Sequence, residues 1–304
     1  MEEKDILKRL VENEALFRNI HVITQNYDII PKDNKHIGAY IEFQDIRELR
    51  EDFLEELIDS IVDWIYSSDK FVALKQKAMD KGKSEAAATQ EVGRKARQKF
   101  RADHNTDKLL IQGQFGELLL FHFIQRFMKA TPLLRKMKIA TSSEHERFGA
   151  DAIHYKIQDG KNIIILGEAK TYSSKYKFAK AFEDAINSIV NTYKEHRREL
   201  NFYVHEDFLD NDMNEVAEDY LNNELKNVEV HLVSIITYNE NRKRKLENES
   251  NIRKQIEKII ADRYHAFDNS KIDIEKNPIL KRITYIVFPV WDLRGLAQEF
   301  QNMI

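Results

Sequence analysis

The spacing of hydrophobic residues divides the chain into predicted helices and strands, because apolar side chains recur every three to four residues in helices and every second residue in strands. Strands are predicted at 20–24 and 37–43. A helix over about 45–66 has one apolar face, and residues 70–105 predict a polar helix that closes in the basic run 94–101. The first third of the chain is therefore predicted to be an α/β region with a long helical part.

From residue 113 onward, the order of the predicted elements indicates the fold. A helix at 113–130 is apolar almost all round, which is typical of a buried helix. Three strands, a long amphipathic helix, and then strand, helix, strand and helix follow it, at 136–142, 149–157, 162–170, from Phe178, at 228–238, 250–264, 283–291 and 293–304. This order predicts an α/β (α+β) protein with a mixed β-sheet flanked by helices.

Composition narrows the class of protein and of site. The 304 residues carry a net charge of −3, so attraction to phosphate has to come from local basic patches rather than from the whole chain. The absence of cysteine excludes disulfides and thiolate metal sites and fits a reducing compartment. No apolar run approaches the roughly 20 residues of a membrane helix, and charge begins at the second residue. These features predict a soluble, cytoplasmic protein with no membrane partner.

Residues 149–170 carry three ionisable side chains on an otherwise apolar pair of strands. The Asp-Gly pair at 159–160 is a strong signal for a two-residue hairpin turn. With that turn, Asp151 lies directly opposite Glu168 on the neighbouring strand. Side chains alternate along a strand, so Lys170 projects from the same face, about 7 Å from Glu168.

Two carboxylates directly opposite each other repel, and a divalent cation removes the repulsion. Mg²⁺ prefers oxygen ligands and takes one or two carboxylates beside water and phosphate. Asp151 and Glu168 would supply two oxygens, and the carbonyl of Ala169 a third. Lys170 is then placed to orient or deprotonate an attacking water or to neutralise charge in the transition state. The residues alone also allow a second interpretation, in which Lys170 neutralises one acid in a structural salt bridge.

The Gly-Ala-Asp at 149–151 and the Glu-Ala-Lys at 168–170 resemble the motif of the PD-(D/E)XK nuclease superfamily. The order of elements over roughly 113–240 also matches the core of that superfamily. More narrowly, "FGADAIHY" followed by "LGEAK" is similar to the HamA nuclease family of Hachiman anti-phage defence systems. Ala150 stands where the superfamily has a proline. The resemblance implies a restriction-endonuclease-like core at 106–304, with residues 1–105 as an N-terminal α/β and helical extension for contacts with a partner or DNA.

The resemblance also implies an activity and its site. It implies a Mg²⁺-dependent deoxyribonuclease that also accepts Mn²⁺, with the metal on Asp151 and Glu168 and with Lys170 completing the site. Superfamily members often carry a glutamate on the preceding helix that reaches the metal through water, a role that falls on Glu117 here. The alternative for Glu117 is that it pairs with a buried arginine. The implied partners are DNA and the HamB-like superfamily 2 helicase of the same defence system.

Several basic residues near the hairpin are candidates for contacts with nucleic-acid phosphates. Lysines at the start of a helix oppose its dipole, so their placement beside a metal site favours phosphate contacts, and a solvated face is the alternative. The candidates are Arg147, Lys175, Lys177 and Lys180. The basic runs at 94–101 and 241–245 are compatible with DNA, an acidic partner or a solvated surface. The acidic stretch 206–219 would repel DNA.

Two other functions remain compatible with the sequence. The first is a catalytically inactive adaptor with a nuclease fold, which binds a helicase or DNA without cutting it. The second is a metal-dependent hydrolase of another phosphate ester, which would use the same residues on small substrates.

Overall fold

A computed structural model of the chain describes residues 3–102, 108–134, 150–172, 178–204 and 211–304. Its centre is a seven-stranded mixed sheet, with the strand order β1-β2-β9-β8-β7-β6-β5. The strands are β1 (Ile20–Gln25), β2 (His36–Ile41), β5 (Thr131–Leu134), β6 (Ala152–Gln158), β7 (Lys161–Tyr172), β8 (Val228–Asn239) and β9 (Ile283–Val290). The four strands β2, β9, β8 and β7 are parallel, while β1 and the pair β6 and β5 run antiparallel to their neighbours. The predicted α/β class with a mixed sheet is confirmed.

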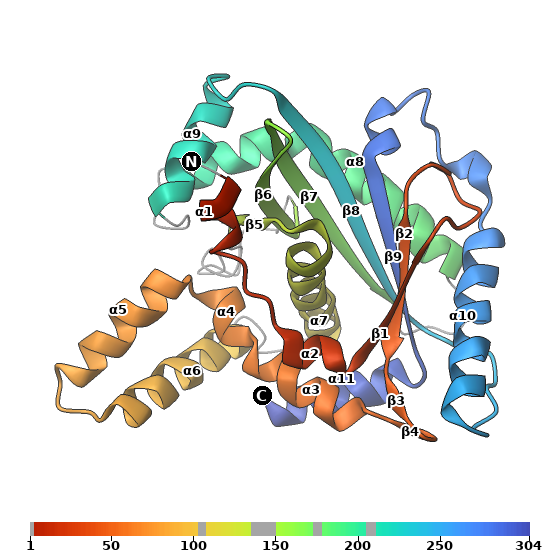
Figure 1. Cartoon of the computed structure of the whole chain (residues 1–304), viewed down its shortest axis with the longest axis horizontal. Helices are drawn as coiled ribbons and strands as arrows, with labels where there is room; N and C mark the ends of the chain where they lie inside the picture. Colours follow the sequence, from red (N-terminus) through yellow and green to blue (C-terminus); the bar gives the residue numbers. More distant parts are fainter. Residues whose placement is uncertain (1–2, 103–107, 135–149, 173–177, 205–210) are drawn as a thin grey trace.

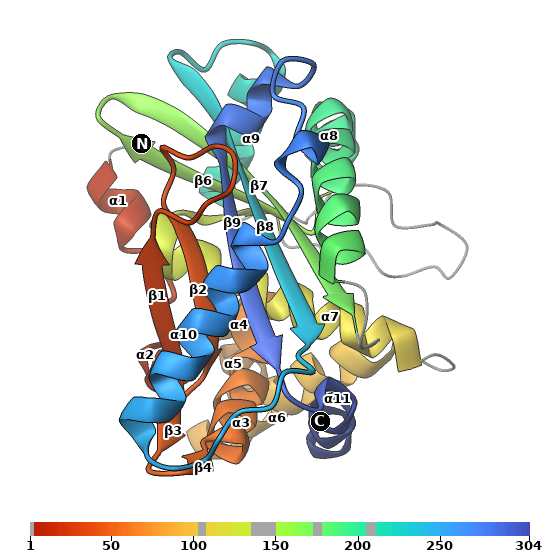
Figure 2. The same ribbon diagram turned by 90° about the vertical axis from the view of Figure 1, so that its right-hand side faces the viewer.

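Helices cover both faces of this sheet (Figures 1 and 2). On one face, apolar residues of α8 (Phe178–Tyr203), α9 (Asn211–Leu221) and α10 (Glu249–His265) form one core. On the other face, a second core joins α2 (Glu14–Arg18), α3 (Arg50–Asp59), α4 (Ile61–Ile65), α6 (Glu85–Ala102), α7 (Lys108–Phe123) and α11 (Leu293–Met303). Helices α1 (Glu3–Leu7) and α5 (Ser68–Met79) complete the set, with 3-10 turns at Asn269–Lys271 and Pro278–Arg282. No helix among the described residues is both long and apolar enough to cross a membrane.

The predicted elements differ from the structure mainly where turns interrupt a continuous pattern. The helix expected from residue 45 begins only at Arg50, because Asp45 adopts a positive φ of 57° between the short strands β3 (Phe43–Gln44) and β4 (Arg47–Glu48). The helix then breaks at Ser60 between α3 and α4.

Further along the chain, the polar helix expected at 70–105 is divided into α5 and α6. Helix α7 begins before residue 113 and passes into a π-helical turn at Ile124–Met128. The edge strand β5 was not predicted, and the strand expected at 136–142 lies outside the described residues. Helix α9 was also not predicted, because the many acidic residues of 206–219 interrupt the apolar pattern that would indicate a helix.

Strands from both predicted regions of the chain belong to the same sheet. Strand β2 of the N-terminal region pairs in parallel with β9, at Ile37 with Ile286. Strand β9 in turn pairs with β8, which pairs with β7. The division of the chain at residue 105 stays a prediction.

Candidate functional site

The hairpin that carries the candidate site has the predicted register. Asp159 and Gly160 adopt positive φ values of 52° and 70°, the left-handed backbone that a two-residue turn of this kind requires. Along β6 and β7, Ile153 pairs with Leu166, and the same offset continues to the end of β6. Each face of the hairpin is therefore fixed by the turn, since a slip of one residue would exchange the two faces.

Asp151 lies directly before β6 and extends the ladder of hydrogen bonds between the two strands. Its backbone N–H donates to the carbonyl of Gly167 at 3.0 Å. Its side-chain Oδ2 accepts from the backbone N–H of Ala169 at 2.8 Å. These two bonds go to Gly167 and Ala169, the residues on either side of Glu168. Asp151 therefore lies opposite Glu168, as the register predicted.

Glu168 points to the face of the sheet that α8 covers, and its side chain is only 5% exposed. Oε1 accepts from Lys170 Nζ at 2.7 Å and from Ser188 Oγ at 2.6 Å. Oε2 accepts from Thr192 Oγ1 at 3.1 Å. Ser188 and Thr192 are one helical turn apart on α8, so both hydroxyls reach the same carboxylate from one helix.

Burial and a neighbouring negative charge set the protonation of Glu168. Burial raises the pKa of Glu168 above its ordinary value, and the charge of Asp151 raises it further. The Lys170 ammonium and the Ser188 hydroxyl oppose this rise, because both stabilise the carboxylate. A buried acid next to a second acid is an arrangement that functional sites often contain.

The oxygen donors of this site fit a magnesium ion. Asp151 lies directly before β6 and Glu168 lies on the adjacent strand β7, and the repulsion between the two carboxylates is what a divalent cation relieves. No group of three or more acids and histidines in the described part of the chain is arranged to hold a metal. Mg²⁺ needs only one or two carboxylates, with water and substrate phosphate as further ligands. Use of the Ala169 carbonyl as a ligand stays a prediction.

Helix α7, which carries Glu117, packs on the other side of the sheet from Glu168. A Cβ atom on Gly116, the neighbour of Glu117, would lie 2.6 Å from Thr171 Oγ1 and 3.4 Å from the Ala169 Cβ, so α7 packs on the face opposite Glu168. Glu117 itself is half-buried on this helix. Its predicted place on a largely buried helix is confirmed, and its role at the metal stays a prediction.

The predicted phosphate contacts are described only at Lys180. Arg147, Lys175 and Lys177 lie outside the described residues. Lys180 pairs with Asp184 Oδ1 at 2.5 Å, and the Tyr172 hydroxyl donates to the other oxygen of Asp184 at 2.6 Å. Lys180 therefore has a carboxylate partner on its own helix, and its contact with phosphate stays a prediction.

Sequence reasoning did not select Ser188 and Thr192. The signal was present, since two hydroxyl residues spaced by four stand on the buried side of an amphipathic helix. A buried hydroxyl needs a partner. The partner here is Glu168 of the adjacent strand.

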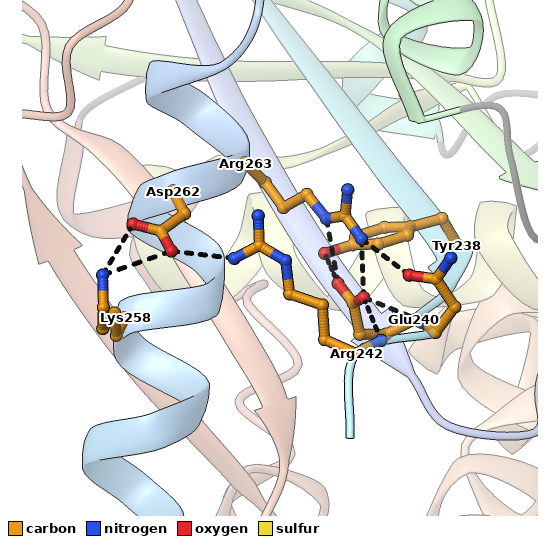
Figure 3. Close-up of polar contacts among 7 residues, drawn as sticks. Tyr238, Glu240, Arg242, Lys258, Asp262 and Arg263 are labelled. Atoms are coloured by element: carbon orange, nitrogen blue, oxygen red, sulfur yellow. Dashed lines mark hydrogen bonds and ion pairs between the residues drawn. The ribbon is translucent and has the colours of Figure 1, made fainter. Parts of the chain in front are cut away.

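A second buried acid, Glu240 at the end of β8, is held by a complete set of donors (Figure 3). Arg263 of α10 donates to both carboxylate oxygens, at 3.0 and 2.6 Å. The Tyr238 hydroxyl and the backbone N–H groups of Asn241 and Arg242 donate to the same carboxylate. Because these donors come from α10 and from the loop after β8, their bonds to Glu240 fix both elements to the sheet.

The two arginines of the basic run 241–245 form ion pairs within the fold. Arg242 pairs with Asp262 at 2.8 Å, and Arg244 pairs with Glu48 at 3.3 Å and lies 4.0 Å from the ring centroid of Trp291. Both arginines therefore hold the fold together. Of the basic residues in this run, only Lys243 and Lys245 are exposed.

Comparison with known proteins places the chain in one family. No curated protein matches the chain. The model of the HamA family matches residues 15–304, a range that includes every strand of the sheet and the whole hairpin of Asp151, Glu168 and Lys170. The chain therefore belongs to the HamA family of Hachiman defence proteins.

Proposed function

We propose that this HamA-family protein is a metal-dependent DNA nuclease of the PD-(D/E)XK type and the effector subunit of an anti-phage defence complex. The observation that supports it most is the convergence of Asp151, Glu168 and Lys170 on adjacent strands, with Glu168 buried and held by two hydroxyls of α8. A structural salt bridge needs one acid for one lysine. The second acid, beside a buried first one, favours a site for a cation.

Asp151 and Glu168 would hold Mg²⁺, with Mn²⁺ as a substitute. When bound, the ion would polarise the scissile phosphate and lower the pKa of the attacking water. The protein's own contribution begins with orientation. Ser188 and Thr192 fix the Glu168 carboxylate, and the N–H of Ala169 fixes Asp151, so both ligands are preorganised before substrate arrives.

Lys170 acts at the reacting phosphate. Its side chain is 27% exposed while its Nζ touches Glu168, so the ammonium lies between the buried acid and the solvent from which substrate comes. From there it orients the water for attack and neutralises the negative charge that develops on phosphorus oxygens. Glu117 orients a water at the same site from the α7 side. No covalent intermediate is needed.

A superfamily 2 helicase of the same system is the proposed partner that controls access to DNA. The net charge of −3 supports this division of labour, because a chain of this charge has little general attraction to DNA. A nuclease with strong DNA affinity of its own would endanger the cell that makes it.

The first experiment is cleavage of plasmid and linear DNA with Mg²⁺, with and without the helicase. The test variant is Glu168→Ala with Lys170→Ala. The matched control is Lys161→Ala with Glu229→Ala, which removes another lysine–glutamate pair of 2.7 Å that also involves β7, at the opposite end of that strand. Cleavage lost only in the test variant supports the proposal, and equal cleavage by all three proteins refutes it.

The alternative is a nuclease-fold adaptor that does not cut, and metal binding separates the two. A nuclease of the proposed kind gains thermal stability with Mg²⁺ or Mn²⁺, because the ion binds the folded state. The same gain should vanish in the double variant at 168 and 170. No cleavage under any condition, together with no stabilisation by metal, would favour the adaptor.

A further inference from the structure

Helices α5 and α6 form a hairpin whose charge is opposite to that of the rest of the chain. Residues 68–102 contain ten lysines and arginines against four aspartates and glutamates. The hairpin therefore carries a net charge of +6, while the whole chain carries −3. A local surplus of this size creates a positive surface on a protein that is otherwise acidic.

The hairpin projects from the body of the molecule (Figure 1). Its base is anchored where Phe100 of α6 packs edge-on against Trp64 and Phe300. Helix α5 packs mainly on α6, and its outer surface faces solvent. In Figure 1 the hairpin extends outward from α4 at the lower left, away from the sheet.

Some of these cations are neutralised within the hairpin and others are not. Lys83 and Lys95 both pair with Glu91, and Lys75 pairs with Glu85 at 3.0 Å. Four exposed cations have neither an ion pair nor a ring contact with any described residue, namely Lys70, Lys77, Lys81 and Arg94, whereas the exposed Lys99 lies 5.1 Å from the ring centroid of Tyr66. The unpaired charge is thus on the surface and available to a ligand.

The spacing of the unpaired cations suits a phosphate backbone. Lys70, Lys77 and Lys81 follow one side of α5 and its C-terminal turn, at separations of seven and four residues. At 1.5 Å per residue they extend over about 16 Å. Successive phosphates of one strand advance about 3.4 Å along the axis of the duplex, so a row of this length extends over about five steps of that axis.

We propose that the α5–α6 hairpin binds the sugar–phosphate backbone of the DNA substrate; this inference rests on the proposed nuclease function and names a second contact for the same substrate. Docking of an acidic protein would call for an apolar centre, because charges at a rim contribute little affinity. Among the described residues of the hairpin, Val72 is the one exposed large hydrophobic side chain. A row of exposed cations with almost no apolar surface favours nucleic acid.

The test measures binding without cleavage, by fluorescence anisotropy of a labelled duplex with the full-length chain in EDTA, at salt concentrations from 50 to 200 mM. The hairpin variant carries Lys70→Gln, Lys77→Gln, Lys81→Gln and Arg94→Gln. The control variant loses the same charge at four exposed lysines elsewhere that also have no ion pair with a described residue, by Lys35→Gln, Lys226→Gln, Lys254→Gln and Lys276→Gln. Thermal unfolding verifies that both variants are folded.

Loss of four phosphate contacts should lower the slope of log affinity against log salt by about 3 to 4 and weaken binding at 50 mM salt by about tenfold or more. The control variant should stay within about twofold of the wild type. Equal weakening in both variants would mean general electrostatics and would overturn the inference. Wild-type binding by the hairpin variant, or no binding by the wild type at 50 mM salt, would overturn it as well.

The proposed function fails in a different way. If the wild type binds DNA through the hairpin but shows no cleavage with metal or helicase, the hairpin contact stands and the nuclease activity does not. If cleavage depends on Glu168 while the hairpin variant binds and cuts like the wild type, the nuclease stands and the hairpin contact does not. A hairpin variant that binds DNA normally but no longer binds the helicase would assign the surface to that protein instead.

Discussion

The two hydroxyls that hold Glu168 can be removed without touching any proposed metal ligand. Ser188→Ala and Thr192→Val are expected to weaken metal binding in a protein that remains folded. In the structure, Ser188 binds Oε1 at 2.6 Å and Thr192 binds Oε2 at 3.1 Å. Without them, Lys170 is the one described residue whose side chain still binds the carboxylate, and it draws Glu168 toward itself rather than toward a cation.

The magnitude follows from these bonds. A hydrogen bond to a charged group contributes about 1.5–3 kcal/mol, and about 1.4 kcal/mol corresponds to a factor of ten in affinity. The short Ser188 bond belongs at the upper end of that range, and the longer Thr192 bond at the lower end. We therefore expect Ser188→Ala to weaken the affinity for Mn²⁺ about 10- to 100-fold, and Thr192→Val about tenfold, in line with the loss of other partners of metal ligands.

The assay is calorimetric titration of each variant with Mn²⁺ at constant pH, with Glu168→Ala as the reference for lost binding. Ser60→Ala is the control, because it removes another buried hydroxyl, one at the break between α3 and α4 that lies 2.7 Å from Nε2 of His122 on α7. It should lower stability without changing metal affinity. Unchanged Mn²⁺ affinity in the Ser188→Ala, Thr192→Val double variant, with affinity lost in Glu168→Ala, would refute the idea that these hydroxyls orient the ligand.

Three further predictions concern stability. The pKa of Glu168 lies above its ordinary value of 4.5, so the stability that its protonated form confers is present below that value and is lost as pH rises through the folded pKa. Glu168→Gln should therefore raise the melting temperature of the metal-free protein relative to wild type, and this difference should grow from pH 4 to 8. A difference that shrinks as pH rises would contradict this. Arg263→Ala should cost about 3–5 kcal/mol in urea unfolding, because Glu240 is left charged and buried, while Mn²⁺ affinity stays unchanged. Gly116→Ala should cost about 1–3 kcal/mol through the close contact with Thr171, and Thr171→Ala in the same chain should restore part of it.

The β6–β7 hairpin was predictable from the sequence because the residues that determine it are close together in the chain. Asp159 and Gly160 set the turn, and alternation along the two strands then sets which residues share a face. The placement of Asp151 and Glu168 follows from these two facts alone. Local signals also indicated the long helices and the strong strands β8 and β9.

The residues that contact the β6–β7 hairpin from other elements were not predictable in the same way. Ser188 and Thr192 meet Glu168 only because α8 crosses β7, and the angle of that crossing depends on packing rather than on residue spacing. The pairing of β2 with β9 is a contact between residues almost 250 positions apart, for which one sequence carries no direct signal. The break between α3 and α4 was hidden because apolar residues continue across Ser60.

The pairing of β2 with β9 also has a consequence for how the protein is made. The hairpin of β6 and β7 is local in sequence and can form as soon as it leaves the ribosome, but β2 has to wait for a strand that is synthesised more than 240 residues later. Until then, one edge of β2 and one edge of β8 are open to mispairing. Complete assembly is therefore confined to nearly finished chains, and a chain stopped before Ile283 should expose residues 36–41 to proteolysis during synthesis.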